Sequence, residues 1–101
     1  MCTYNRRFCL KQAIDSVLCQ TYPDFEFVIV DDGSTDGTEE LIKSYQDPRI
    51  RYFKLNRNSF YCYAANQGLD HCQGDYVAFM NSDDAWLPDK LEKQVTVMDC
   101  L

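Results

Sequence analysis

The stretch FEFVIVDDGSTDGT, residues 25–38, decides the fold of this chain. Its first part, Phe25 to Val30, is apolar apart from one glutamate and rich in β-branched and aromatic residues, as in strands covered on both faces. The acids, glycines and hydroxyls that follow are typical of a turn, and apolar residues then recur at helical spacing over residues 38–45. The stretch therefore predicts a central parallel strand that leads through a turn into a helix.

The segments on either side continue this alternation. Apolar residues recur at helical spacing before the central strand, and two more short apolar runs follow the helix after it. We expect helices over residues 8–20, 61–72 and 88–98, and strands over residues 50–55, near the sheet edge, and 76–80. This order predicts an α/β fold of one domain, with a three-layer, open, mostly parallel sheet and helices on both faces.

Composition narrows the class of function. The 101 residues suffice for one core, and the formal net charge of −6 argues against binding nucleic acid or an anionic membrane surface. Six cysteines include no CxxC pair and His71 is the single histidine, so a zinc site is not indicated. We expect reduced cysteines that fill small apolar positions on helices, in a cytoplasmic protein, because disulfides are rare in that compartment.

Two acidic pairs follow two of the predicted strands. Asp31 and Asp32 come directly after the central strand, and Asp83 and Asp84 come shortly after residues 76–80. Ligands of open α/β sheets bind beyond the carboxyl ends of the strands, so we expect both pairs at one ligand-binding edge. There a carboxylate can accept a hydrogen bond from a base or a sugar, and the concentrated negative charge favours Mg²⁺ or Mn²⁺ bound together with substrate phosphates. The alternative is that these acids only shape turns and cap helices.

Further short motifs occur along the chain in a fixed order. They are Thr3-Tyr4-Asn5-Arg6, Gln20-Thr21-Tyr22-Pro23, the residues 31–38 quoted above, Asn66-Gln67-Gly68, Gly74-Asp75-Tyr76-Val77-Ala78-Phe79 and Ser82-Asp83-Asp84-Ala85-Trp86-Leu87-Pro88-Asp89-Lys90-Leu91. As an ordered set that covers essentially the whole chain, they resemble the family 2 glycosyltransferases of the GT-A fold. The resemblance implies a transferase that binds a nucleotide-diphosphate sugar, with a UDP-sugar favoured.

The resemblance also implies roles for single residues on the nucleotide side. Cys2, Thr3 and Tyr4 match a loop that packs around the base, and Asp32 matches the acid that accepts a hydrogen bond from a base N–H. Asn66 matches a position of the donor site. These five residues, together with Asp83, are therefore the candidate contacts to the nucleotide.

The second acidic pair matches the DXD-type motif of the family. The resemblance assigns Asp83 to the ribose and to the metal site, and Asp84 to the metal on the diphosphate, with Mn²⁺ or Mg²⁺ as the cofactor. Two positions depart from the family pattern: Ala65 stands where many members have arginine, and Asn81 where many have a first aspartate. We therefore expect weakened contacts to the donor and the metal.

The ends of the chain depart further from the family. Members have an apolar first strand before the segment that matches Cys2-Thr3-Tyr4, whereas only Met1 precedes it here, so we expect that strand to be missing. The part that binds a saccharide or other hydroxyl acceptor and supplies the general base for an inverting transfer is expected outside residues 1–101, which form a single partial domain. We expect the exposed strand edges to favour a homodimer. We expect a cytoplasmic location, and a full-length parent can also lie at the cytoplasmic face of a membrane.

Three other functions remain open from the sequence. The chain can be a non-catalytic module that binds nucleotides, or an assembly module whose acids only cap helices. A receiver-like signalling domain shares an acidic pocket of this kind, but it does not explain the motif Trp86-Leu87-Pro88-Asp89-Lys90-Leu91.

Overall fold

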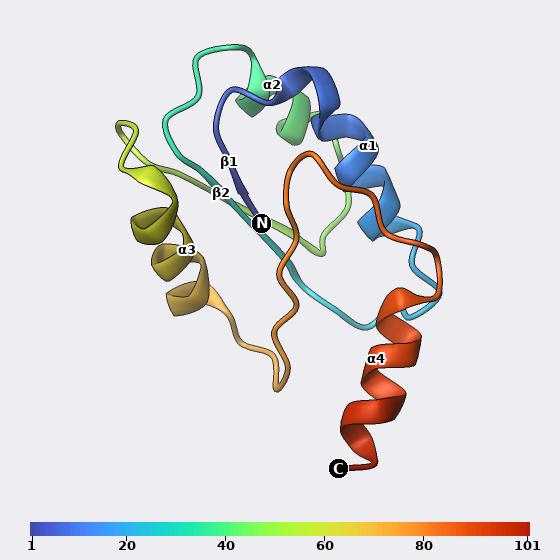
Figure 1. Cartoon of the computed structure of the whole chain (residues 1–101). Coiled ribbons are helices and arrows are strands. Elements are labelled where there is room, and N and C mark those ends of the chain that lie inside the picture. The colour runs from blue at the N-terminus through green and yellow to red at the C-terminus, as the bar shows by residue number, and fades with distance from the viewer.

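The structure of the chain is a computed structural model, which describes residues 1–101. In chain order the elements are β1 (Cys2–Thr3), α1 (Arg7–Leu18), β2 (Phe27–Asp31), α2 (Thr38–Lys43), β3 (Ile50–Lys54), α3 (Phe60–His71) and α4 (Lys90–Asp99), shown in Figure 1. All of these elements except β1 lie within a few residues of the predicted ranges, because their hydrophobic periodicity is strong.

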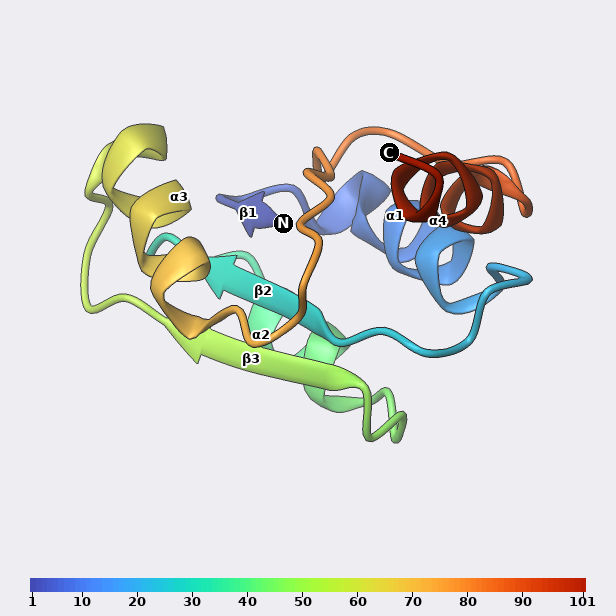
Figure 2. The ribbon, with the colours of Figure 1, turned by 90° about the horizontal axis from the view of Figure 1, so that it is seen from below.

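The sheet has the order β1-β2-β3, and both pairs of strands are parallel. β2 lies in the centre and β3 at the edge, as predicted. α1 and α2 cover one face of the sheet and α3 covers the other, which Figure 2 shows from below. The predicted α/β class with helices on both faces of a parallel sheet is therefore confirmed.

The core is built around β2, whose five residues are all buried. On one face, Phe27 and Ile29 pack against α1 and α2 in a cluster of eight buried residues. On the other face, Val28 and Val30 pack against Ala64 of α3. Each such side chain contributes about 1.5–3 kcal/mol when it leaves water. The carboxyl end of β2, where the first acidic pair lies, is thereby held firmly.

Two expectations at the amino-terminal edge of the sheet were wrong. Residues 76–80 are not a strand, and the only pairing in this region is an isolated parallel bridge between Cys2 and Asn81. The expected loop at Cys2 and Thr3 is instead strand β1, which lies between β2 and Asn81. β1 has only two residues, so most of the 76–80 run finds no partner and stays exposed.

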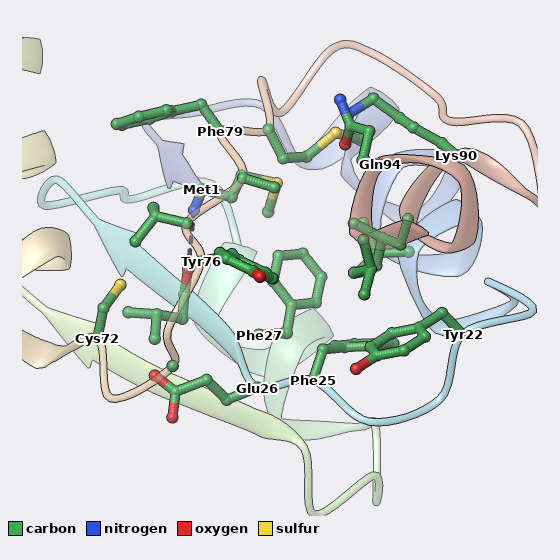
Figure 3. Close-up of a pocket in the computed structure, with 18 of the residues that line it drawn as sticks. Met1, Tyr22, Phe25, Glu26, Phe27, Cys72, Tyr76, Phe79, Lys90 and Gln94 are labelled. Atoms are coloured by element: carbon green, nitrogen blue, oxygen red, sulfur yellow. Dashed lines mark hydrogen bonds between the residues drawn. The ribbon is translucent and has the colours of Figure 1, made fainter. Parts of the chain in front are cut away.

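An open cavity of about 1240 Å³ lies beside the first half of β2. Figure 3 shows Phe27 on one side of it, Tyr76 and Phe79 of the unpaired segment on another, and α4 beyond. Met1 lies at its rim, where the amino group donates a hydrogen bond to the Val28 carbonyl at 2.8 Å. Burial lowers the pKa of this amino group.

The cysteines and α4 differ in detail from expectation. All six cysteines are free, as expected, but none is fully buried, and Cys19, Cys62 and Cys100 are exposed. α4 begins at Lys90 rather than at the preceding proline, and none of its residues is buried. Among all the helices, none combines the length and the apolar character that crossing a membrane requires.

Candidate donor-binding site

The site begins where two loops at the carboxyl end of the sheet hold each other. The Asn5 amide donates to Ser34 Oγ at 2.9 Å, and Asn5 Oδ1 accepts from the Thr35 amide at 2.9 Å. Asn5 has a φ of 50°, a left-handed conformation that asparagine tolerates better than most residues. The loop after β1 is therefore fixed to the loop after β2.

Asp36 makes the next contact between these loops. Its carboxylate accepts from the Arg7 amide at 3.0 Å and from Thr38, at the start of α2. Burial raises the pKa of Asp36, but the hydrogen bonds from Thr38 and Arg7 outweigh it and hold the pKa below its usual value. Asp36 thus shapes the turn and serves the helix start, as the structural alternative for this motif predicts.

The two adjacent acids after β2 have different environments. Asp31 is fully buried and accepts from the Tyr52 hydroxyl at 2.6 Å and from the Ser34 amide at 2.9 Å. Burial, together with this hydrogen bond to Asp31, raises the pKa of the Tyr52 hydroxyl. Because both of its oxygens are bonded inside the protein, Asp31 is a structural residue that fixes the turn.

Asp32 keeps one oxygen free. It is only 5% exposed, and its Oδ1 accepts from the Ser59 amide at 2.7 Å, but no protein group donates to Oδ2. The loop that carries Ser59 approaches closely because residue 33 is glycine: a Cβ there would lie 2.8 Å from the carbonyl carbon of Arg57, and Gly33 has a φ of +83°. Asp32 is therefore a nearly buried carboxylate, held in place, with one acceptor left for a ligand.

The three residues predicted around the base take different positions. The Cys2 side chain packs toward the cluster of Val28 and Val30, beneath α3. Thr3 is buried, and its hydroxyl has no hydrogen-bond partner, while its carbonyl accepts from the Asp32 amide at 2.8 Å. Tyr4 is the exposed member of the three. Of these three side chains, only that of Tyr4 is exposed to solvent.

The second acidic pair lies in a turn beside β1. The bridge between Cys2 and Asn81 brings this turn to the carboxyl end of the sheet, and the Asp84 amide donates to the Asn81 carbonyl at 3.1 Å. Asn81 Nδ2 also donates to Asp84 Oδ2 at 3.2 Å. Asp83 and Asp84 are both exposed. The two acidic pairs therefore belong to the same edge of the sheet, as predicted from their place after two of the apolar runs.

The structure does not gather these acids into a ready metal cage. No group of three or more histidine, cysteine, aspartate or glutamate side chains is close enough to hold an ion. Asn66 is exposed on α3 and makes no side-chain hydrogen bond, and its neighbour Ala65 lines the apolar cavity. Of the candidate site residues, only Cys2 lines that cavity, so the cavity is largely separate from the candidate donor site.

Comparisons with known proteins identify the family. The family model described as Glycosyl transferase family 2 matches residues 1–100. The chain belongs to this family. It is 46% identical over 98 residues to the putative teichuronic acid biosynthesis glycosyltransferase TuaG of Bacillus subtilis, covering 95% of this chain and 39% of TuaG. It thus spans about two fifths of that relative's length.

Solved structures of glycosyltransferases show the same fold. The crystal structure of Staphylococcus aureus TarS with UDP-GlcNAc has a TM-score of 0.93 and 29% identity, over 97% of this chain and 29% of that one. The mannosyltransferase PcManGT from Pyrobaculum calidifontis, in complex with GDP-Man and Mn²⁺, has a TM-score of 0.78 and 27% identity, over 84% of this chain and 26% of that one. The GT-A resemblance inferred from the motifs is therefore confirmed.

Two contacts of the site were not predicted from the sequence. Asn5 belongs to one of the motifs quoted above, where it was given no role. Its residue type was a signal of a tight turn, because asparagine is enriched among residues in left-handed conformations. The Ser59 amide had no signal, because a backbone donor acts whatever its side chain is. Its position depends instead on the approach of residues 57–59 to Gly33.

Proposed function

We propose that this chain forms the donor-binding part of an inverting glycosyltransferase that uses a nucleotide-diphosphate sugar, with a UDP-sugar favoured, and a divalent cation. The observation that carries the proposal is Asp32, a nearly buried carboxylate with Oδ2 free at the carboxyl end of the central strand. Such an acceptor suits the N–H of a uracil ring, and ligands of open α/β sheets bind at this edge. Tyr4 supplies an exposed aromatic ring, and the residue before it, Thr3, accepts a hydrogen bond from the Asp32 amide.

The second acidic pair fits a divalent cation that arrives with the nucleotide. Mg²⁺ and Mn²⁺ commonly use one or two carboxylates together with substrate phosphates, so the absence of a third protein ligand is compatible with such a site. We assign Asp84 to the metal and Asp83 to the ribose and the metal. When bound, the cation supplies a Lewis acid that stabilises charge on the departing diphosphate.

The chain's own groups have a binding and orienting part in this reaction. Asp32 and Tyr4 hold the nucleoside, Asp83 and Asp84 meet its phosphate side, and the hydrogen bonds of Asn5 and Asp36 keep the loops from moving apart. The general base that accepts the proton of the acceptor hydroxyl is expected in a part of the parent outside residues 1–101. The parent would then act in the cytoplasm or at the cytoplasmic face of a membrane on a saccharide or other hydroxyl acceptor.

Calorimetric titration tests this proposal. UDP is expected to bind with a weak affinity that depends on Mn²⁺, and UDP-sugar is expected to undergo no transfer with the isolated chain. Nucleotide binding without transfer in the full-length parent would instead support a non-catalytic nucleotide-binding module. Absence of UDP, GDP and other nucleoside diphosphate binding with Mn²⁺ present would support an assembly module.

We also propose that the isolated chain self-associates through the unpaired segment beside β1. Tyr76, Val77 and Phe79 are exposed there, and an extended segment without strand partners favours pairing with another copy. Light scattering after size-exclusion chromatography is expected to give a homodimer or a larger species. A monodisperse monomer at high micromolar concentration would contradict this part of the proposal.

A further inference from the structure

The segment that carries Asp83 and Asp84 has little apolar support. From Gln73 to Asp89 only Met80 and Ser82 are buried, and pairing with the sheet is limited to one bridge. α4, which follows, has no buried residue. Core packing alone therefore leaves the acidic turn weakly fixed.

Helix α1 supplies polar contacts along this segment. Cys9 Sγ donates to the Ser82 carbonyl at 3.6 Å, and Ser16 Oγ accepts from the Trp86 amide at 3.1 Å. Ser16 Oγ also donates to a carbonyl of its own helix, 2.8 Å away. Figure 1 shows the orange segment running past α1 before it enters α4. One helix thus holds the chain on both sides of the acidic turn, at Ser82 and at Trp86.

Gln20, just after α1, makes the central contact. It is 6% exposed, and its Nε2 donates to the Leu87 carbonyl at 2.7 Å and to the Ser16 carbonyl at 3.1 Å. Its Oε1 accepts from the Leu91 amide at 2.9 Å. A side-chain amide both donates and accepts, whereas an ionised glutamate only accepts. The Gln20 amide therefore matches both backbone groups, which lie on either side of the turn into α4.

We propose that Gln20 and Ser16 are positioning residues for the donor site. By fixing residues 86–91 they set where Asp83 and Asp84 stand beside β1, although neither side chain touches the nucleotide. This inference rests on the proposed function, because it concerns the metal-dependent part of nucleotide binding. The inference concerns only the metal-dependent contacts of Asp83 and Asp84. The contact to the base is assigned to Asp32, on the other side of β1.

The test compares two ligands on variants of the chain. Gln20→Ala is expected to weaken UDP binding in Mn²⁺ about tenfold, the scale of one lost hydrogen bond to a buried backbone group, and to leave uridine binding unchanged. Gln12→Ala, at an exposed position of α1 with no side-chain hydrogen bond, is the matched control and is expected to change neither. A parallel loss of UDP and uridine affinity, or full retention of the Mn²⁺-dependent gain, would overturn the proposal. Gln20→Glu should resemble Gln20→Ala, since it loses the donor.

Amide hydrogen exchange tests the positioning role of Gln20 and Ser16 without a ligand. In Gln20→Ala and in the milder Ser16→Ala, amide hydrogen exchange is expected to accelerate at Asp84 and Leu91 but not at Ile29 in the core. Unchanged exchange at Asp84 in both variants would overturn the positioning role. If the unmodified chain shows no Mn²⁺-dependent UDP binding, the proposed function fails instead, and the exchange result still tests the positioning of the turn.

Discussion

Residues 1–72 and residues 73–101 are held together by different kinds of contact. Of the 18 buried residues, all but Met80 and Ser82 lie in the first region, on both faces of a parallel sheet. The second region has one bridge to the sheet, a helix without a buried residue, and polar contacts to α1 and to Gln20 just after it. One acid of the candidate donor site, Asp32, belongs to the first region, and the DXD-type pair belongs to the second. The base side of the site is thus held by core packing, whereas the metal side is held mainly by polar contacts.

The largest expected effect tests the difference in packing. Ile29→Ala, at a fully buried position of β2, should lower the free energy of unfolding by about 2–5 kcal/mol because it removes buried methyl groups and leaves a cavity. Val97→Ala, at a position of α4 that is 61% exposed, should stay within about 0.5 kcal/mol. Urea unfolding followed by circular dichroism measures both. Comparable losses of unfolding free energy in the two variants would show that α4 is packed as firmly as the core, contrary to the difference between the two regions.

The next effect separates binding from folding. Asp84→Ala should reduce Mn²⁺-dependent UDP affinity by at least about tenfold, equivalent to about 1.4 kcal/mol, with little change in stability, because the side chain is exposed. Asp36→Ala should instead lower stability by about 1 kcal/mol, since it removes acceptors for the Arg7 amide and the start of α2. Calorimetry and urea unfolding distinguish the two. Equal loss of binding in two folded variants would end the metal assignment.

A smaller effect concerns the backbone at the start of α3. Phe60 has a φ of 69° and is 77% exposed, so Phe60→Gly should relieve left-handed strain and stabilise the chain by about 0.5–1 kcal/mol. Phe8, also exposed but inside α1, is the matched control: Phe8→Gly should destabilise by about 0.5–1 kcal/mol. Thermal unfolding gives the signs. A loss of stability in both variants would show that the Phe60 ring contributes more than its backbone costs.

The smallest effect is a dependence of stability on pH at the rim of the cavity. Burial lowers the pKa of the Met1 amino group from its usual 8.0, so the unfolded chain binds more protons near neutral pH. The contribution of this group is fully present above pH 8 and is lost as pH falls through the lowered pKa. Urea midpoints should therefore rise toward pH 8, also in a His71→Gln variant that removes the single histidine. A flat profile in that variant would contradict the burial of the amino group.

The sequence allowed the first region to be predicted better than the second. The run from Phe27 to Asp31 is rich in β-branched and aromatic residues, which favour a buried strand whichever strand pairs with it. Its place in the centre of the sheet therefore followed from local pattern. The run from Tyr76 to Met80 is also almost wholly apolar, yet it pairs with almost nothing, because pairing depends on a neighbour far away in sequence. Local pattern predicts the tendency to form a strand, whereas the partner decides whether one forms.

The candidate site shows the same division. The acids were identified from their positions after apolar runs, but nothing local distinguishes Asp31 from Asp32. Alternation along the strand turns one toward Tyr52 inside the protein and leaves the other with a free oxygen. The role of Gln20 was also hidden, because its three partners include carbonyl and amide groups that every residue type possesses.

The two termini offer very different places for an experimenter to attach something. A purification tag or fluorophore joined to Met1 would be attached at a buried amino group that donates a hydrogen bond to the Val28 carbonyl. Such an attachment would disturb β1, which begins at the next residue. Leu101 is 93% exposed at the end of α4, which Figure 1 shows extending away from the rest of the chain. Labels at this end should therefore leave the sheet and its core undisturbed.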